Sequence, residues 1–361
     1  MRFAALLLAF TPAMCFPGAE NQAAMRNAAG PAVYPRTAGE TSASVTPSNF
    51  GFPVCNVLRY GADDSGAVDA STAFIDALKA CNGATVIVPN GTYKLNRTLT
   101  LPPNTTLQGQ NKRTTKLSSG ANVDMLIMQD GSALYQIYLE GNGGSGRGIV
   151  INTGHGNQTV QNARIINFDP GSTKGVVDFT ATDAGSRSTF SDCEVWNKNG
   201  ATGSGKYAFK IFDALEAKAH PRKFTGIETA GFASFAFGGA NDLFISNSFL
   251  ADLLYSRNSR SVQIVASRIA NQSTLTIDGG NQTLIADDVN PKITLAATLT
   301  NSVIGPISEN HAPIIDNTGG NNSVQVFEYR QTYTPTMSNS GGDFDLGNGK
   351  ISGYYSRIGS A

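Results

Sequence analysis

The sequence is poor in charge and in long apolar runs. Charged side chains make up 15% of the 361 residues, and 27 basic residues balance 27 acidic ones, so the formal net charge is zero. A nucleic-acid binder needs a basic face that neutralises phosphates, and the neutral balance therefore argues against a nucleic-acid partner. No run approaches the ~18 apolar residues of a spanning helix, so the sequence predicts no membrane span.

The residues that are abundant favour strands and turns. The chain contains 39 glycines and 30 asparagines, whereas its hydrophobic fraction of 40% is ample for a core. Low charge together with many Gly, Asn, Ser and Thr residues is unfavourable for a helical bundle and suits short strands joined by tight turns. The composition predicts an all-β, repetitive protein.

A six-residue pattern recurs in the middle of the chain: apolar, any, small or polar, small, any, apolar. Val160–Ile165 and Phe190–Val195 are two examples. The pattern begins at positions 134, 160, 190, 224, 244, 264 and 284. A period near 20 with strand-forming residues predicts a β-solenoid whose stacked coils bury a continuous core. The leucines and helix of a leucine-rich repeat are missing, and a propeller would need a period of about 40.

Upstream of the repeat, the sequence predicts a capping helix. Asp69 can cap a helix over residues 70–81, which places Phe74, Ile75 and Leu78 on one face. Residues 85–93 then resemble strand, turn and strand, and residues 106–109 the end of another strand. Such a helix would cover the apolar end of a solenoid.

The ends and the cysteines leave alternatives open. Residues 1–20 contain a basic start and a short apolar run, which fits either a cleavable secretion signal or an anchoring segment. Residues 21–52 are expected to form a linker. Cys55 and Cys81 can pair in an oxidising compartment, although buried free thiols are the favoured interpretation, and no cysteine spacing predicts a metal site.

The stretch before the repeat resembles the capping region of the pectate-lyase superfamily. The resembling residues are Tyr60, Gly61, Ala62, Asp63 to Gly66, Asp69, Thr72, Pro89, Gly91, Tyr93, Leu107 and Gly109. The resemblance implies a single-stranded right-handed parallel β-helix over residues 53–325, with residues 53–110 as its capping region. Because this region occurs in hydrolases, lyases, epimerases and phage tailspikes, it does not imply one activity.

Two further stretches resemble bacteriophage and prophage tail proteins. They are residues 34–50 and the C-terminal segment 326–361, which resembles the opening of a small phage-fibre β-domain. This resemblance implies a homotrimeric tailspike-like protein, on a virion or outside the cell, that attaches to a phage tail or virion through its N-terminal region and binds cell-surface polysaccharide.

One outward position of the repeat predicts a candidate site. Position five contains Tyr138, Arg164, Glu194, Glu228, Ser248, Arg268 and Asp288. Glu194 and Glu228 would be one coil apart, as a glycosidase acid and nucleophile or base require, and their repulsion should raise one pKa. Arg164, Arg268 and Asp288, with the ring of Tyr138, would line the substrate site. The insertion 197–221, which contains His220, would wall it, and Trp196 could stack on a sugar. A solvated face of ion pairs is the alternative.

Other catalytic motifs are incomplete. Gly154-His155-Gly156 resembles a polygalacturonase site, but the Asp pair and the Arg-Ile-Lys of that family are missing, so a turn histidine is expected. Asp287 and Asp288 lack the companions of a lyase calcium site, and no metal or other cofactor is predicted. The sequence therefore predicts a polysaccharide-binding, tailspike-like protein. The alternatives are a secreted glycoside hydrolase, a polysaccharide lyase, and a non-catalytic virion or surface protein.

Overall fold

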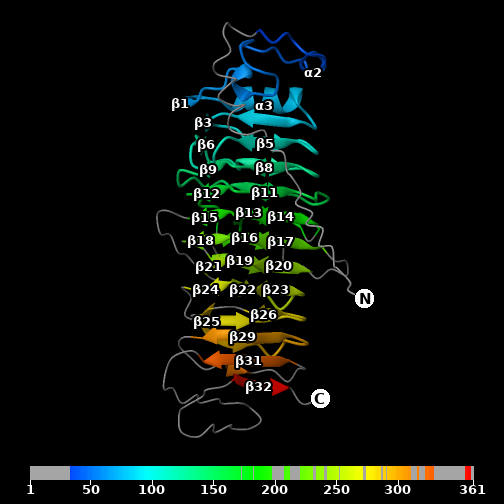
Figure 1. The fold of residues 1–361 in the computed structure, drawn as a ribbon, viewed down its shortest axis with the longest axis vertical. Helices are drawn as coiled ribbons and strands as arrows, with labels where there is room; N and C mark the ends of the chain where they lie inside the picture. Colours follow the sequence, from blue (N-terminus) through cyan, green and yellow to red (C-terminus); the bar gives the residue numbers. More distant parts are fainter. Residues whose placement is uncertain are drawn as a thin grey trace, which may run out of the picture.

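Short parallel strands coil into one column that is capped at its N-terminal end (Figure 1). The computed structural model describes residues 33–361 except for 172, 182, 197–206, 212–219, 231–232, 240–241, 252, 271–273, 286–287, 290, 310–314, 317–321, 329–353 and 359–361. The expected right-handed parallel β-helix is confirmed. No helix in the described part of the chain is both long and apolar enough to cross a membrane.

Each full coil contributes one strand to each of three ladders. The first ladder contains β2 (Thr85–Val88), β5 (Thr106–Gly109), β8 (Ala133–Tyr135), β11 (Thr159–Gln161), β14 (Ser188–Ser191), β17 (Arg222–Thr225), β20 (Leu243–Ser246), β23 (Val262–Val265), β26 (Thr283–Ile285) and β29 (Val303–Glu309). The second contains β3 (Gly91–Leu95), β6 (Thr115–Ser119), β9 (Tyr138–Glu140), β12 (Arg164–Ile166), β15 (Glu194–Trp196), β18 (Glu228–Ala230), β21 (Phe249–Leu250), β24 (Arg268–Ile269) and β27 (Asp288–Val289).

The third ladder lies in separate sheets. It contains β4 (Leu99–Leu101), β7 (Leu126–Met128), β10 (Ile149–Ile151), β13 (Gly175–Phe179), β16 (Tyr207–Ile211), β19 (Ala233–Phe237) and β22 (Leu253–Tyr255), followed by the sheet of β25 (Thr274–Ile277), β28 (Lys292–Leu295) and β30 (Ile315–Asp316). At the capped end, η1 (Val57–Tyr60) and β1 (Ser65–Asp69) precede the first coil. At the other end, β31 (Ser323–Glu328) pairs with β29 and, antiparallel, with β32 (Tyr354–Ile358).

Left-handed residues form the corners between the first and second ladders. Asn162, Asp192 and Asn247 have φ of 54°, 54° and 49°, and Gly226 has 65°. Asn and Asp tolerate this backbone better than most residues, because their short polar side chains can hydrogen-bond locally. Eight of the sixteen non-glycine residues with positive φ in the described chain are asparagine, so corners account for part of the asparagine surplus.

Aromatic rings stack along the interior of the middle coils. Phe190 and Phe224 lie 5.2 Å apart between ring centroids, and Phe209 and Phe235 lie 4.6 Å apart. All four are completely buried. The apolar positions of the repeat therefore point inward, and this buried area is the main source of stability.

The predicted capping helix is present as α3 (Ser71–Ala80). Asp69 Oδ1 accepts hydrogen bonds from the backbone nitrogen of Ser71, at 3.0 Å, and from its hydroxyl. Phe74 and Leu78 are buried, whereas Ile75 is half-buried. The helix thus covers the end of the core, as expected.

The described part of the predicted linker, residues 33–52, contains buried structure. It forms α2 (Ala38–Ser42), and the completely buried Glu40 lies 2.5 Å from Arg59 Nε. The hydroxyl of Tyr60 also donates to Glu40, at 3.0 Å. Burial opposes ionisation of Glu40, but hydrogen bonds from Arg59, Thr37 and Tyr60 lower its pKa to about 2. This stretch therefore packs on the cap, which local composition could not show.

Cys55 and Cys81 form a disulfide, so the interpretation as free thiols was wrong. Their Cα atoms are 5.7 Å apart, within the range of a disulfide. The bridge ties the chain before β1 to the end of α3. Cys193 is a buried free thiol. The segments 1–20 and most of 326–361 lie outside the described residues.

Candidate functional site

Outward side chains of the second ladder form a column of charged and aromatic residues. We call the outward side chains from β3 to β24 the charged face. It contains Thr92, Lys94, Lys116, Ser118, Tyr138, Glu140, Arg164, Ile166, Glu194, Trp196, Glu228, Ala230, Phe249 and Arg268. Seven of these fourteen residues are charged. In particular, Glu194 pairs in register with both Arg164 and Glu228, as the repeat predicts.

One member of the predicted column was wrong. Phe249, and not Ser248, pairs with Glu228. The repeat at this coil begins at Ile245, which pairs with Phe224, because Phe244 and Ile245 are both apolar and the sequence pattern fits either register. Ser248 is buried, and its hydroxyl accepts a hydrogen bond from the backbone of Ile227 at 3.0 Å.

Glu194 is held by three cations from two parts of the chain. Its carboxylate oxygens lie 2.8 Å from Arg164 Nε, 2.9 Å from Lys112 Nζ and 3.8 Å from Arg113. The side chain is only 9% exposed. Burial opposes its ionisation, but the hydrogen bonds from Lys112 and Arg164 outweigh burial and hold the pKa of Glu194 below its usual range. Glu194 is therefore an ionised anchor for basic side chains.

Glu228 lies in register with Glu194 but in a different environment. Glu228 is exposed, and its other neighbour in the ladder is Phe249. The sequence interpretation required one of the two carboxyls to be a proton donor with a raised pKa. The lowered pKa of Glu194 excludes Glu194 as that donor, because Lys112 and Arg164 keep its carboxyl ionised.

Aromatic rings enclose the guanidinium of Arg164. Its Cζ lies 5.0 Å from the ring centroid of Tyr138 and 5.3 Å from that of Trp196. On the adjacent coil, Lys116 Nζ lies 5.1 Å from the Tyr138 ring. The indole nitrogen of Trp196 is buried and makes no hydrogen bond within the described residues. Cation–π contacts thus fix Arg164 in a partly desolvated setting, where they are strongest.

Glu140 is a second buried carboxylate on this face. The hydroxyl of Tyr138 and the amide of Asn167 donate to it, the latter at 2.8 Å, and Lys116 Nζ lies 3.7 Å away. Although burial opposes ionisation, these hydrogen bonds lower the pKa of Glu140, whereas burial and Glu140 raise that of Tyr138. Tyr138 is therefore positioned as a neutral hydrogen-bond donor.

The sequence did not reveal Lys112 and Arg113. They lie in the turn between β5 and β6, and they reach Glu194 three coils further along the column. The later corners, such as that at Asn162, are much shorter, so the length of this turn is the sequence signal that marks the two residues. Arg113 has 66% of its side chain exposed and faces solvent beside Glu194. This turn adds positive charge to the site.

The remaining predicted residues lie elsewhere. Arg268 is exposed, contacts the ring of Phe249 at 5.4 Å and pairs in register with Asp288. It is four coils from Arg164, or about 19 Å along the column. His220 is buried near Asp183. Burial opposes the ionisation of Asp183, but hydrogen bonds from the hydroxyl of Thr153 and the backbone of Gly154, in the corner after β10, lower its pKa. Most of the expected wall, residues 197–206 and 212–219, lies outside the described residues.

His155 lies in a corner between β10 and β11, as expected for a turn histidine. Its Nδ1 is 3.7 Å from Asp130, which also accepts a hydrogen bond from the backbone of Gly156 at 2.6 Å. Gly154 has a φ of 75°, which the turn requires. Within the described ranges, no group of three or more His, Cys, Asp or Glu residues is arranged to hold a metal ion.

A second polar cluster connects loops beside the third ladder. Arg147 lies 2.6 Å from Asp124 and 2.7 Å from Asp178. Hydrogen bonds from Arg147 outweigh burial and lower the pKa of Asp124. Arg147 is paired with both carboxylates, so the cluster joins neighbouring coils and has no positive charge left for an anionic ligand.

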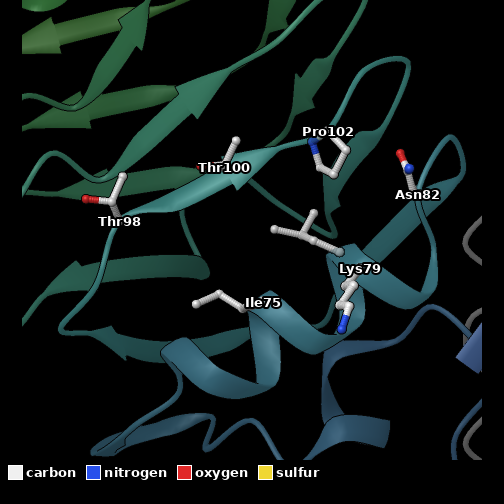
Figure 2. Close-up of a pocket in the computed structure, with 7 residues that line it drawn as sticks. Ile75, Lys79, Asn82, Thr98, Thr100 and Pro102 are labelled. Atoms are coloured by element: carbon white, nitrogen blue, oxygen red, sulfur yellow. The ribbon is translucent and has the colours of Figure 1, made fainter. Parts of the chain in front are cut away.

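A groove lies at the capped end, between α3 and β4 (Figure 2). Its volume is about 390 Å³, and it is lined by Ile75, Leu78, Lys79, Asn82, Thr98, Thr100 and Pro102. Lys79 is its one charged lining residue. The groove shares no residue with the charged face.

Solved structures resemble this chain at low sequence identity. PfbA, a surface adhesin of Streptococcus pneumoniae, is 14% identical, covers 85% of this chain and 98% of its own, and has a TM-score of 0.55. ORF18 of Geobacillus virus E2 is 11% identical over 78% of this chain, with a TM-score of 0.50, and this chain spans 62% of that protein. The Acinetobacter phage vB_ApiP_P1 tailspike protein is 11% identical over 74% of this chain and 53% of its own, with a TM-score of 0.41.

No curated protein sequence matches the chain. A family profile does match, over residues 54–278, which include α3 and most of the coils. Its description is rhamnogalacturonase A/epimerase, pectate lyase-like. The match agrees with the capping residues, the repeat and the parallel ladders. The chain belongs to the rhamnogalacturonase A/epimerase, pectate lyase-like family.

Proposed function

We propose that this protein binds acidic cell-surface polysaccharide through the charged face. The observation that supports this proposal most strongly is a local surplus of positive charge. Four cations, Lys112, Arg113, Lys116 and Arg164, surround two carboxylates, Glu140 and Glu194. Arg113 is mainly exposed and can pair with a saccharide carboxylate. The family and the adhesin with the same fold support this proposal.

The proposed location is a virion or the outside of a cell. A disulfide persists in oxidising environments, and the Cys55–Cys81 bridge fits such a location. The viral protein with the same fold supports the phage association. We further propose that the protein attaches to a phage tail or virion through its N-terminal region. We also propose that it assembles as a homotrimer.

Glycan cleavage is the second candidate, supported by the register of Glu194 and Glu228. Since Glu194 is held ionised, it would act as nucleophile or base, and the exposed Glu228 would be the proton donor. Release of reducing ends from polygalacturonate by the wild type, and its loss in Glu228→Gln, would support a hydrolase. A wild type that binds this polymer and releases none contradicts cleavage of this polymer.

Binding is tested by calorimetric titration with polygalacturonate, with neutral dextran as the comparison polymer. Arg113→Ala should weaken polygalacturonate binding about three- to fivefold, because an exposed charge pair contributes up to about 1 kcal/mol. Arg257→Ala, which removes an exposed arginine far along the column, is the matched control and should bind normally. If the wild type binds neither polymer, the alternative of a non-catalytic structural protein is favoured.

A further inference from the structure

The first ladder presents an outward surface almost without charge. We call it the neutral face. Its residues are Thr85, Ile87, Thr106, Gln108, Ala133, Tyr135, Thr159, Gln161, Thr189, Ser191, Lys223, Thr225, Phe244, Ser246, Gln263, Val265, Thr283, Ile285 and Val303. Only Lys223 of these nineteen is charged, or about 5%, whereas 15% of all residues in the chain are charged.

This face is accessible and regular. Gln161, Lys223 and Gln263 are exposed, and Val303 is 42% exposed. Its strands lie one above another in Figure 1 and pair without a register shift from β2 to β26. The outward side chains therefore repeat every ~4.8 Å along the column.

We propose that the neutral face is the surface on which a second copy of this chain packs. Copies have the same spacing between coils, so the neutral faces of copies that turn them toward one common axis can interdigitate along the whole length of the column, as a homotrimer requires. Because the face has almost no charge, two copies do not repel each other, and threonine and glutamine side chains both donate and accept hydrogen bonds. A charged partner would find no complement here.

The size of the face fits this occupant. Ten strands at ~4.8 Å spacing and about four residues of width, at ~3.3 Å per residue, give a flat area of about 600 Å². The relief of the side chains adds to it, and a standard interface buries about 600–1,000 Å² per partner. The inference builds on the self-assembly in the proposed function and does not depend on glycan binding.

Analytical ultracentrifugation of the full chain tests the proposal. The wild type should sediment as an oligomer. A variant with Gln161→Arg, Thr189→Arg and Gln263→Arg should fall to the mass of one chain, 37.9 kDa, because like charges then face each other. A variant with Glu at the same three positions should also sediment as a single chain. A mixture of the Arg and Glu variants should form oligomers again, which misfolded chains could not do.

Thr100→Arg with Leu254→Arg provides the control, because both are exposed positions of the third ladder. This variant should remain oligomeric. A monomeric wild type, an oligomeric Arg variant or a mixture that stays monomeric overturns the proposal. A monomer that binds polygalacturonate contradicts the neutral-face interface alone, whereas an oligomer that does not bind it contradicts the proposed function alone.

Discussion

Two ladders of one β-helix share a backbone geometry and differ in what they show to solvent. On the charged face, seven of fourteen outward residues are charged, whereas on the neutral face one of nineteen is. Both ladders bury the same kind of apolar side chain inward. Because the apolar core requires only the inward positions, the outward ones are free to differ, and the difference between the faces indicates different uses.

The largest effect should come from the core that both faces share. Phe224→Ala removes a ring that stacks on Phe190 and contacts Phe209 edge-on. We expect a loss of about 3–5 kcal/mol of unfolding free energy, because the cavity lies between coils that cannot collapse. Chemical denaturation measures this loss. A change below about 1 kcal/mol would contradict a continuous core.

A smaller effect should separate the faces. Glu194→Ala leaves Lys112 and Arg164 without their carboxylate and should cost about 1–3 kcal/mol. Thr189→Ala, on the neutral face of the same coil, should change stability by no more than about 0.5 kcal/mol. Denaturation of both variants checks the contrast. Equal losses would mean that the charged network does not stabilise its face.

The sequence predicts a feature well when the residues that form it lie close together in the chain. Core positions repeat within a coil, so the pattern at Val160 and Phe190 was sufficient for the fold and for the pairing of Glu194 with Glu228. At Phe244 and Ile245, two apolar neighbours make the register ambiguous, so the sequence pattern predicts Ser248 at the position where the structure has Phe249.

Interactions between distant residues could not be predicted. Lys112 reaches Glu194 over three coils, and no local pattern links the two positions. The Cys55–Cys81 bridge depends on a Cα separation that only the packing of α3 fixes. Likewise, the buried ion pair between Glu40 and Arg59 holds part of the predicted linker on the cap, and no local pattern links these two residues. The proposed roles of the candidate site residues remain predictions.

Acid should diminish the difference between the two faces in their contribution to stability. The pKa values of Glu140 and Glu194 are lowered from their ordinary value of 4.5. Their stabilising contribution is therefore complete above about pH 5 and is lost as pH falls through the lower folded-state values. Melting temperatures from pH 7 to pH 3 should show wild type and Glu194→Gln converging. The difference in melting temperature between wild type and Thr189→Ala should not depend on pH. If it does, the pH dependence cannot be assigned to the carboxylates of the charged face.

The smallest effect concerns salt. Exposed ion pairs such as that of Arg113 are screened within about 8 Å at physiological ionic strength. We expect Arg113→Ala to change the melting temperature by less than a degree or two at any salt concentration, since the residue contributes to binding and little to folding. Calorimetric melting at low and high salt measures this. A large, salt-dependent destabilisation would make Arg113 a structural residue of the charged face.

The most direct test of the division between the faces is one set of calorimetric titrations with polygalacturonate. It compares the wild type, Arg113→Ala and the neutral-face variant Gln161→Arg, Thr189→Arg, Gln263→Arg, with affinity expressed per chain. We predict binding weakened three- to fivefold in Arg113→Ala. The affinity at the charged face should be retained in the neutral-face variant. Unchanged affinity in Arg113→Ala, together with lost binding in the neutral-face variant, would contradict the account.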